Sequence, residues 1–339
     1  MSKEKAPNLP QTNPELFQVE PTLVDFSDII KDHFGETAMV MMYGSAAFKQ
    51  LGYSQEDIQT SKLDCIVAVP DLKQWHQEHA ERHPEDFPMV AHLLGPKVRT
   101  KIQGKKSWFV HTELPIQDGK YQRKIKVGII EQAALVDDLT EWNQFYVAGR
   151  MQKPTYIAET NQEINQALYY QTMKQGLRLT LLQHQGDQPI NLRDLYINLS
   201  NLSYTGDTRM MFAENRNKVA NIVDANLWRF DLMYQQLIKE AETDGLLFVQ
   251  DDYIIPLPWQ ENHELLIEAI SQLPLNLIST LPEGWRELSH DQLIELVNKK
   301  LAEIVKTSSI AQTIFGLLMV SPTTGIKYVA QKVRKARKK

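Results

Sequence analysis

Two short apolar runs near the N-terminus limit most strongly what this chain can fold into. Residues 38–43 (AMVMMY) and 63–69 (LDCIVAV) have the length of buried strands and are too short for core helices. The first run ends in Gly44-Ser45 and the second ends at Pro70, so a turn signal closes each of them. Because helical spacing follows both runs, they predict an α/β unit.

The rest of the chain extends this pattern. Residues 108–111 and 125–130 are predicted as further strands, and residues 24–34, 72–79 and 133–146 as helices. Residues 163–182 and 219–242 have helical spacing, residues 248–257 indicate a strand or hairpin, and the chain is helical again from residue 291. We therefore expect a disordered lead over 1–20, an α/β domain over 21–153, a mainly helical domain over 154–290 and a helical C-terminal region over 291–339.

The Tyr43-Gly44-Ser45 segment is the first candidate for chemistry. A glycine after a strand lets the backbone approach a ligand closely, and Ser45 adds a hydroxyl donor. If a helix begins there, its free N–H groups suit a phosphate. The alternative is an ordinary turn, because Gly and Ser punctuate many chains.

Asp64 is the second candidate, because it lies inside the apolar run 63–69. A carboxylate is costly to bury unless it is paired or binds a cation. The alternative is an edge-strand aspartate that faces water. A strand, a Gly-Ser turn and a following strand with an aspartate resemble the DNA polymerase beta-like nucleotidyltransferases, although Ile66 stands where a second acidic residue is usual in them.

A narrower resemblance covers nearly the whole chain. The sequence resembles the mitochondrial translocator assembly and maintenance family, which are mitochondrial-type CDP-diacylglycerol synthases. The segments that carry this resemblance are Tyr43-Gly44-Ser45, Leu63-Asp64, Trp75-His76, Gly95-Pro96-Lys97, Lys126-Val127-Gly128-Ile129, Asp138-Leu139 with Trp142, residues 146–154 (YVAGRMQKP), residues 203–210 (SYTGDTRM), Glu214 with residues 218–223 (KVANIV), and residues 308–312 (SSIAQ).

The resemblance implies a fold and an activity. The fold would be a polymerase beta-like nucleotidyltransferase domain, a mainly helical domain for which a winged helix is one option, and a C-terminal amphipathic helix. The activity would be that of a phosphatidate cytidylyltransferase: a phosphatidate oxygen attacks the α-phosphorus of CTP and pyrophosphate leaves. The cofactor would be Mg²⁺, and the partners would be CTP, phosphatidate and an anionic membrane surface.

The same resemblance implies roles for individual residues. Asp64, Ser45 and Lys126 would be catalytic, with Asp64 as the ligand of the metal. The nucleotide would be bound by Tyr43, Gly44, Ser45, Arg150, Lys153, Arg209 and Lys218. His76, Lys97, Asp207, Glu214 and Asn221 are further candidates.

Charged residues gather between Gly206 and Asn221. One interpretation is a salt-bridged turn that leads into a helix. The other is a clamp for the triphosphate, in which Arg209 and Lys218 neutralise anionic oxygens. Asp207 or Glu214 would then be able to supply a second metal carboxylate.

His76, His79 and His83 are spaced so that they could share one helix face and bind a transition metal. Such histidines are more often solvated or partly buried side chains, so a metal site is the less favoured interpretation.

The C-terminus carries the features of a membrane-binding segment. Residues 327–339 contain seven cations and no acidic residue, whereas the whole chain has a net charge of −5. An apolar patch precedes them, so we expect an interfacial amphipathic helix with a polybasic end. Its membrane-binding residues would be Phe315, Leu318, Lys332, Arg334, Lys335 and Arg337. The alternative is that residues 310–320 pack on the core and the lysines are solvated.

Composition limits the setting of the protein. The acidic body does not suggest a nucleic-acid partner. Cys65 is the sole cysteine, which fits a reducing compartment and a buried thiol. The polar N-terminus has no apolar region of a secretory signal. We expect a bacterial relative at the cytoplasmic membrane surface, or on the matrix side of the mitochondrial inner membrane if the chain is a mature eukaryotic form.

Two other functions remain open at this point. One is a nucleotidyltransferase with a soluble acceptor, which would need no lipid. The other is a non-catalytic, membrane-associated assembly factor, against which Gly44-Ser45 and Asp64 argue.

Overall fold

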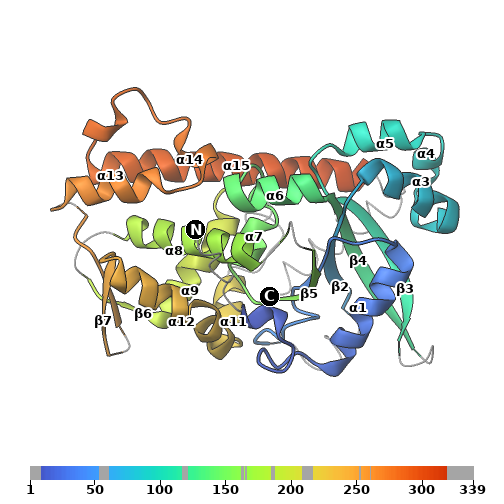
Figure 1. Ribbon diagram of the computed structural model, residues 1–339, viewed down its shortest axis with the longest axis horizontal. Coiled ribbons are helices and arrows are strands. Elements are labelled where there is room, and N and C mark those ends of the chain that lie inside the picture. The colour runs from blue at the N-terminus through green and yellow to red at the C-terminus, as the bar shows by residue number, and fades with distance from the viewer. Residues whose placement is uncertain are drawn as a thin grey trace, which may run out of the picture.

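The computed structural model describes residues 9–52, 61–116, 121–161, 164, 166–184, 188–207, 217–251, 253–259 and 261–318. A mixed sheet lies at one end of the molecule and a group of helices at the other, as Figure 1 shows. A single hydrophobic core runs through both ends, from Leu9 to Phe315.

The sheet has five strands in the order β3-β4-β2-β1-β5. Their bounds are Met39–Tyr43 (β1), Leu63–Val69 (β2), Trp108–Ile116 (β3), Tyr121–Glu131 (β4) and Thr155–Thr160 (β5). β2 and β4 are parallel, and the other neighbours are antiparallel. The two apolar runs are strands as predicted, and the side chains of β1 and β2 are almost all buried.

Helices cover the sheet and continue from its strands. They are α1 (Pro21–Phe34), α3 (Leu72–Arg82), α4 (Met89–His92), α5 (Pro96–Gln103), α6 (Gln132–Glu141) and α7 (Ala148–Met151), with the short 3-10 helices η1 (Pro10–Thr12) and η2 (Pro84–Asp86). Asp71 caps α3 as predicted, because its carboxylate accepts a hydrogen bond of 2.8 Å from the Gln74 amide. Pro21 and Pro96 each stand at the first position of a helix, where no amide donor is needed.

The other end of the molecule is mainly helical. It contains α8 (Gln166–Gln183), α9 (Leu192–Asn201), η3 (Leu202–Tyr204), α11 (Lys218–Asp224), α12 (Leu227–Thr243), α13 (His263–Ser271), α14 (Leu275–Ile278) and η4 (Trp285–Glu287). A small antiparallel sheet has the order β6-β8-β7, formed by Ile190–Asn191 (β6), Leu247–Gln250 (β7) and Tyr253–Pro256 (β8). This arrangement is compatible with a winged-helix unit, which stays a prediction.

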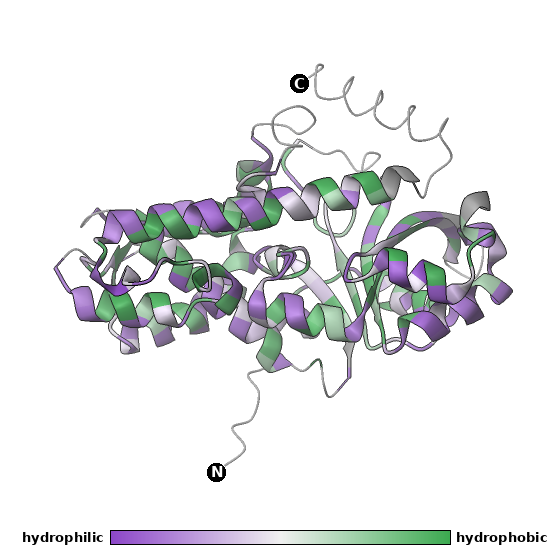
Figure 2. Ribbon diagram, turned by 90° about the horizontal axis from the view of Figure 1, so that it is seen from above, coloured by the Kyte–Doolittle hydropathy of each residue, from purple (hydrophilic) through white to green (hydrophobic). Residues whose placement is uncertain are grey.

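The long helix α15 (His290–Leu318) runs along both ends of the molecule. Near its start, the His290 ring is hydrogen-bonded to the Leu182 carbonyl of α8 (2.8 Å). Near its end, the Phe315 ring packs edge-on against Trp108 of β3, with 5.5 Å between centroids. Figure 2 shows hydrophobic and hydrophilic residues alternating along this helix, as expected of one that covers a core.

Three expectations from the sequence need correction. Residues 9–20 are not a disordered lead, because Leu9 and Phe17 are buried and Phe17 packs against Phe48. The boundary after residue 153 is misplaced, because β5 pairs with β1 in the same sheet. The predicted helix over 219–242 is two helices, interrupted near Asn226. Among the described helices, none combines the length and apolar character needed to cross a bilayer.

Candidate active site

A row of polar residues crosses one face of the five-stranded sheet. Tyr43 pairs with Asp64, Asp64 pairs with Lys126, and Lys126 pairs with His111. Thr155 pairs with Tyr43 on the other side. Because directly paired residues point to the same face of a sheet, these five side chains share one face. The row joins three predicted site residues to each other.

Gly44 lies directly against the Asp64 carboxylate. Its φ is +84°, and a Cβ built on it would come within 3.2 Å of Asp64 Oδ2. Only glycine takes this backbone conformation readily and leaves the carboxylate uncovered. The Gly44 carbonyl then accepts hydrogen bonds from Ala47 (3.1 Å) and Phe48 (2.8 Å), so the chain makes a single helical turn. The regular helix expected directly after Gly44-Ser45 is therefore absent from residues 45–52.

Arg150 adds a cation beside this row. Its guanidinium carbon lies 4.9 Å from the centroid of Tyr43 and 3.8 Å from that of Tyr146, and it donates a hydrogen bond to the Tyr146 carbonyl. Burial opposes the charge, but Tyr146, Tyr43 and Asp64 outweigh burial and raise the pKa of Arg150. Burial also raises the pKa of Tyr43. Arg150 is thus a permanent cation packed against the rings of Tyr43 and Tyr146.

Asp138 fixes the loop that carries Arg150. Its buried carboxylate accepts hydrogen bonds from the amides of Gln144 (2.9 Å), Val147 (2.7 Å) and Ala148 (3.2 Å). Burial raises the pKa of Asp138, while these backbone bonds favour its charged form. This carboxylate therefore sets where α7 begins and where Arg150 points.

The remaining residues of the 146–154 segment join the two ends of the molecule. The Gln152 amide donates to the carbonyls of Ala148 (3.2 Å) and Thr172 (3.1 Å) and accepts from the Tyr234 hydroxyl (2.9 Å). Gly149 has no room for a side chain, because a Cβ there would meet Ser203 at 2.8 Å. The segment thus connects the two ends of the molecule and also carries the cations Arg150 and Lys153.

Lys153 and Lys218 both lie near one aromatic ring, that of Tyr204. Their Nζ atoms lie 4.9 Å and 5.5 Å from the centroid of Tyr204. Lys153 also donates to the Gly149 carbonyl (2.9 Å) and to the Ser203 hydroxyl. The structure therefore brings together two lysines that the sequence proposed separately.

The chain that follows the Gly44-Ser45 turn is tied to α11 and α12. The Leu51 amide donates to the Asn221 carbonyl (3.2 Å), and the Asn226 side chain donates to the Lys49 carbonyl (3.0 Å). Asn221 thus contacts the turn segment through its backbone. These bonds bring the helix that carries Lys218 to the segment that follows Gly44.

The other end of the polar row is also cationic. Lys126 Nζ lies 4.2 Å from the centroid of Phe109, and Lys62 Nζ lies 3.3 Å from His111 Nδ1. Burial, Lys62 and Lys126 lower the pKa of His111. Sequence reasoning missed Lys62 and His111. Lys62 directly precedes Leu63-Asp64, but the register that pairs His111 with Lys126 has no local signal.

Several predicted site residues lie apart from this row. His76 is buried, with its Nε2 hydrogen-bonded to Gln103 (2.9 Å), and burial lowers its pKa to about 3. Asp207 is buried and accepts a hydrogen bond from Ser309 of α15 (2.8 Å), so it anchors that helix. Lys97 is exposed on α5.

The prediction that the Phe315 side chain binds the membrane was wrong. This side chain is 4% exposed and packs against Trp108, because the last described turns of α15 complete the core. The remaining predicted positions lie outside the described residues. Arg209 and Glu214 fall within 208–216, and Lys332, Arg334, Lys335 and Arg337 fall within 319–339. The side chain of Leu318 is also outside the described part of the structure.

Asp64 is the residue of the row with the right chemistry for a hard cation. Mg²⁺ takes oxygen ligands and is usually held by one or two carboxylates together with water and substrate phosphates. The open face that Gly44 leaves beside Asp64 Oδ2 fits this mode of binding. Ile66, two residues along the same strand face, is fully buried and apolar.

Comparison with known proteins gives one consistent result. A family model described as "Phosphatidate cytidylyltransferase, mitochondrial" matches residues 26–335. Proteins of that name are similar to this chain in Danio rerio (27% identity, 94% of this chain and 96% of the relative), in Homo sapiens (28%, 91% and 69%) and in Schizosaccharomyces pombe (28%, 86% and 78%).

Proposed function

Because the chain belongs to the family of mitochondrial-type phosphatidate cytidylyltransferases, we propose which of its residues carry out that reaction. The enzyme makes CDP-diacylglycerol from CTP and phosphatidate, a nucleotidyl transfer of phospholipid synthesis. Nucleotidyltransferases generally use a divalent metal. The observation that carries the assignment of residues is the contact between Gly44 and the Asp64 carboxylate.

The proposed metal is Mg²⁺, held by Asp64. When bound, it would neutralise phosphate charge and help to align the triphosphate. The Gly44-Ser45 turn would hold phosphate oxygens through backbone amides and the Ser45 hydroxyl. Support comes from the position of this turn directly over Asp64, where no side chain intervenes.

Three cations would surround the nucleotide phosphates. Arg150 lies beside Asp64 and Tyr43, and Lys153 and Lys218 lie near the Tyr204 ring. The main obstacle to the reaction is that two anions, CTP and phosphatidate, must come together. Cations held in place beside the phosphates would lower that electrostatic barrier.

We assign the phosphatidate phosphate to the opposite end of the row, where Lys62, His111 and Lys126 gather. Lys126 is the neighbour of Asp64 in the sheet, so an acceptor phosphate held there would lie next to the metal. This phosphate is already anionic near neutral pH, so the attack does not need a strong base.

The finer fold assignment follows from the same site. We propose that the five-stranded sheet is a polymerase beta-like nucleotidyltransferase unit. The elements α8, β6, α9, α12, β7 and β8 would form a winged-helix unit. The β6-β8-β7 order supports the second assignment.

Phosphatidate resides in a bilayer, so the enzyme has to reach a membrane surface. We propose that α5 contributes to this contact. Val98 and Ile102 are exposed on one face of α5, and Leu93, just before it, is 85% exposed. Lys97 and Lys101 are exposed beside them. An apolar stripe bordered by lysines is the pattern of an interfacial helix on anionic lipid.

The test of the reaction is an assay of purified enzyme with each of the four nucleoside triphosphates, with and without phosphatidate vesicles. Pyrophosphate release is expected with CTP and phosphatidate together. Equal release without lipid, or with a soluble acceptor alone, would contradict the assignment of the acceptor.

A further inference from the structure

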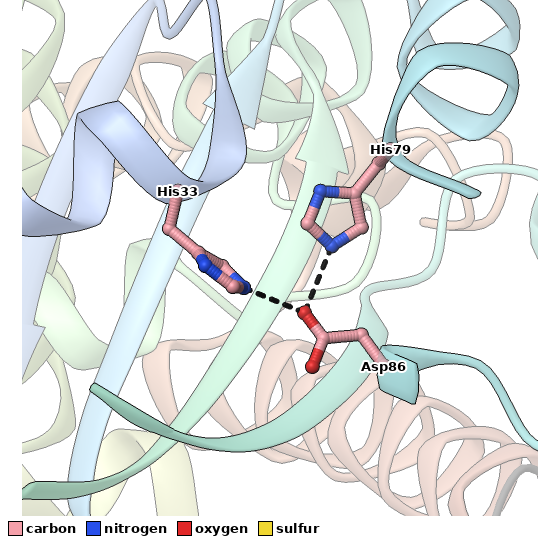
Figure 3. Close-up of side chains that lie close together, drawn as sticks. All are labelled: His33, His79 and Asp86. Carbon is pink, nitrogen blue, oxygen red and sulfur yellow. Dashed lines mark hydrogen bonds and ion pairs between the residues drawn. The ribbon is translucent and has the colours of Figure 1, made fainter. Parts of the chain in front are cut away.

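Three side chains outside the active site converge on one point. His33 Nε2 lies 2.7 Å and His79 Nε2 lies 3.0 Å from the same oxygen, Asp86 Oδ2. Figure 3 shows both imidazole rings pointing their Nε2 atoms at this carboxylate. His79 and Asp86 are buried, and His33 is nearly so. Within the described residues, this is the group of histidine and acidic side chains whose arrangement could hold a metal ion.

The donor atoms suit a transition metal. Two imidazole nitrogens and one carboxylate oxygen are the ligand set that Zn²⁺ and similar cations prefer, whereas Mg²⁺ prefers oxygen alone. The donor atoms of the three residues all lie within 4.8 Å of one another. In a tetrahedral zinc site, ligand atoms about 2.0–2.1 Å from the metal are roughly 3.3 Å apart. The two contacts to Asp86 Oδ2, at 2.7 and 3.0 Å, therefore need to lengthen by roughly 0.3–0.6 Å to admit an ion.

The surroundings of the cluster hold two of its members in place. The His79 ring is stacked on Phe34 (5.2 Å) and on Trp75 (4.8 Å), each at an interplanar angle of 17°. His33 lies at the last turn of α1, directly before Phe34. Asp86, by contrast, lies on the short element η2, where a small shift costs least, because few backbone bonds hold a single turn.

A fourth position is close at hand. The His83 ring is packed against the His33 ring, with 3.8 Å between centroids. His83 is half-exposed and only weakly bonded to Glu85, at 3.4 Å. A rotation of this side chain, or a water molecule, would complete four-coordination, which structural zinc sites require.

We propose that His33, His79 and Asp86 form a binding site for a zinc-like transition-metal ion. The site is structural: it joins the end of α1 to α3 and η2, none of which carries a residue of the polar row. This differs from the arrangement that the sequence suggested. His79 is a ligand, but His76 points elsewhere and is bonded to Gln103.

The experiment uses the full chain, stripped of metal with a chelator and kept in excess Mg²⁺ without substrates. One equivalent of Zn²⁺ should bind in competition with a chromophoric chelator. Co²⁺ should give the visible absorption of a four-coordinate nitrogen and oxygen site. Zn²⁺ should also raise the midpoint of thermal unfolding, because it binds the folded state alone.

Two variants and one control separate this site from adventitious binding. His33→Ala and Asp86→Asn should lose the equivalent of Zn²⁺, the Co²⁺ spectrum and the thermal shift. The exposed His263 lies on α13 and is hydrogen-bonded to the Arg286 carbonyl, so His263→Ala should keep all three. If wild type binds no Zn²⁺, or if both variants bind it as tightly as wild type, the cluster is only a hydrogen-bonded triad and the proposal fails.

Discussion

Gly44 and Asp64 are in such close contact that any side chain at residue 44 would lie against the carboxylate, 3.2 Å from its Oδ2. The turn after the first strand and the aspartate of the second strand are therefore one structural unit. Residue 44 therefore has to be glycine for two reasons: the turn has a positive φ, and a side chain would cover the Asp64 carboxylate. The first two predictions follow from this contact.

Asp64→Asn should abolish turnover while the fold survives. The amide keeps the shape of the side chain but removes the charge that would hold the metal. We expect the turnover number to fall by at least about 100-fold, the scale on which one preorganised electrostatic contact acts. Pyrophosphate release and thermal unfolding should be measured together. Near-normal turnover in a folded variant would remove Asp64 from the mechanism.

Gly44→Ala should impair both CTP binding and turnover. The added Cβ would press on Asp64, and the positive φ adds strain of about 1–2 kcal/mol. Gly245→Ala is a matched control, because Gly245 also has a positive φ (+70°) but no atom within 4 Å of its Cβ position. The control should lose some stability and keep its KM for CTP. Equal kinetic effects in both variants would show that strain alone is responsible.

Arg150→Lys should lower kcat/KM although the charge is kept. Lysine lacks the planar group that stacks on Tyr146 and Tyr43, so its cation would not be fixed in place. Arg193→Lys is the comparison, since Arg193 is exposed and pairs with Asp224 of α11 and not with a residue of the polar row. Steady-state kinetics with varied CTP should separate the two. Wild-type kinetics in Arg150→Lys would mean that Arg150 is only structural.

Val98→Asp combined with Ile102→Asp should reduce sedimentation with phosphatidate vesicles. The substitutions place anions on the exposed stripe of α5, opposite an anionic bilayer. Leu275→Asp is a suitable control, because Leu275 is 61% exposed on α14. Added salt should weaken the binding of wild type by screening its lysines. Unchanged sedimentation of the double variant would place membrane contact elsewhere.

His76 should make the protein less stable as pH falls. Its pKa is about 3 in the folded state and about 6.5 in the unfolded chain. Below pH 6.5 the unfolded state therefore binds a proton that the folded state does not, and stability declines until pH 3. The contribution approaches about 1.4 kcal/mol per pH unit. Urea unfolding of His76→Gln between pH 7 and pH 4 should show a smaller decline than wild type; an equal decline would contradict this origin.

The sequence predicted most of the main sheet, because its strands β1 to β4 are apolar runs that can be recognised locally. Four of the five strands of the main sheet follow from apolar runs, and the Asp71 cap follows from its position before α3. β5 (Thr155–Thr160) was missed, since it pairs with β1 from more than a hundred residues away. A short run after Pro154 gives no local indication of that partner.

The sequence named several residues of the candidate site, but it did not predict how they lie relative to one another. Gly44 and Asp64 were proposed from the turn and from a carboxylate within an apolar run, and Lys126 from a resemblance; the strand register then places Asp64 beside Lys126. The sequence could not show that Phe315 is buried, because an apolar residue near a basic tail fits a core and a membrane equally well. The cluster joins His33 to Asp86, which are 53 positions apart, so helical spacing pointed to His79 but gave no sign of His33 or Asp86.

The length of α15 also determines how this protein can be divided. Its 29 residues span about 43 Å. One end is hydrogen-bonded to α8, and the other end packs against Trp108 of β3. A fragment that ends before α15 would leave Trp108 uncovered and Asp207 without Ser309. The half that carries the polar row is therefore not an independent folding unit: Phe315, which packs on its Trp108, comes from the far end of the chain, and a truncation before residue 315 should destabilise that half.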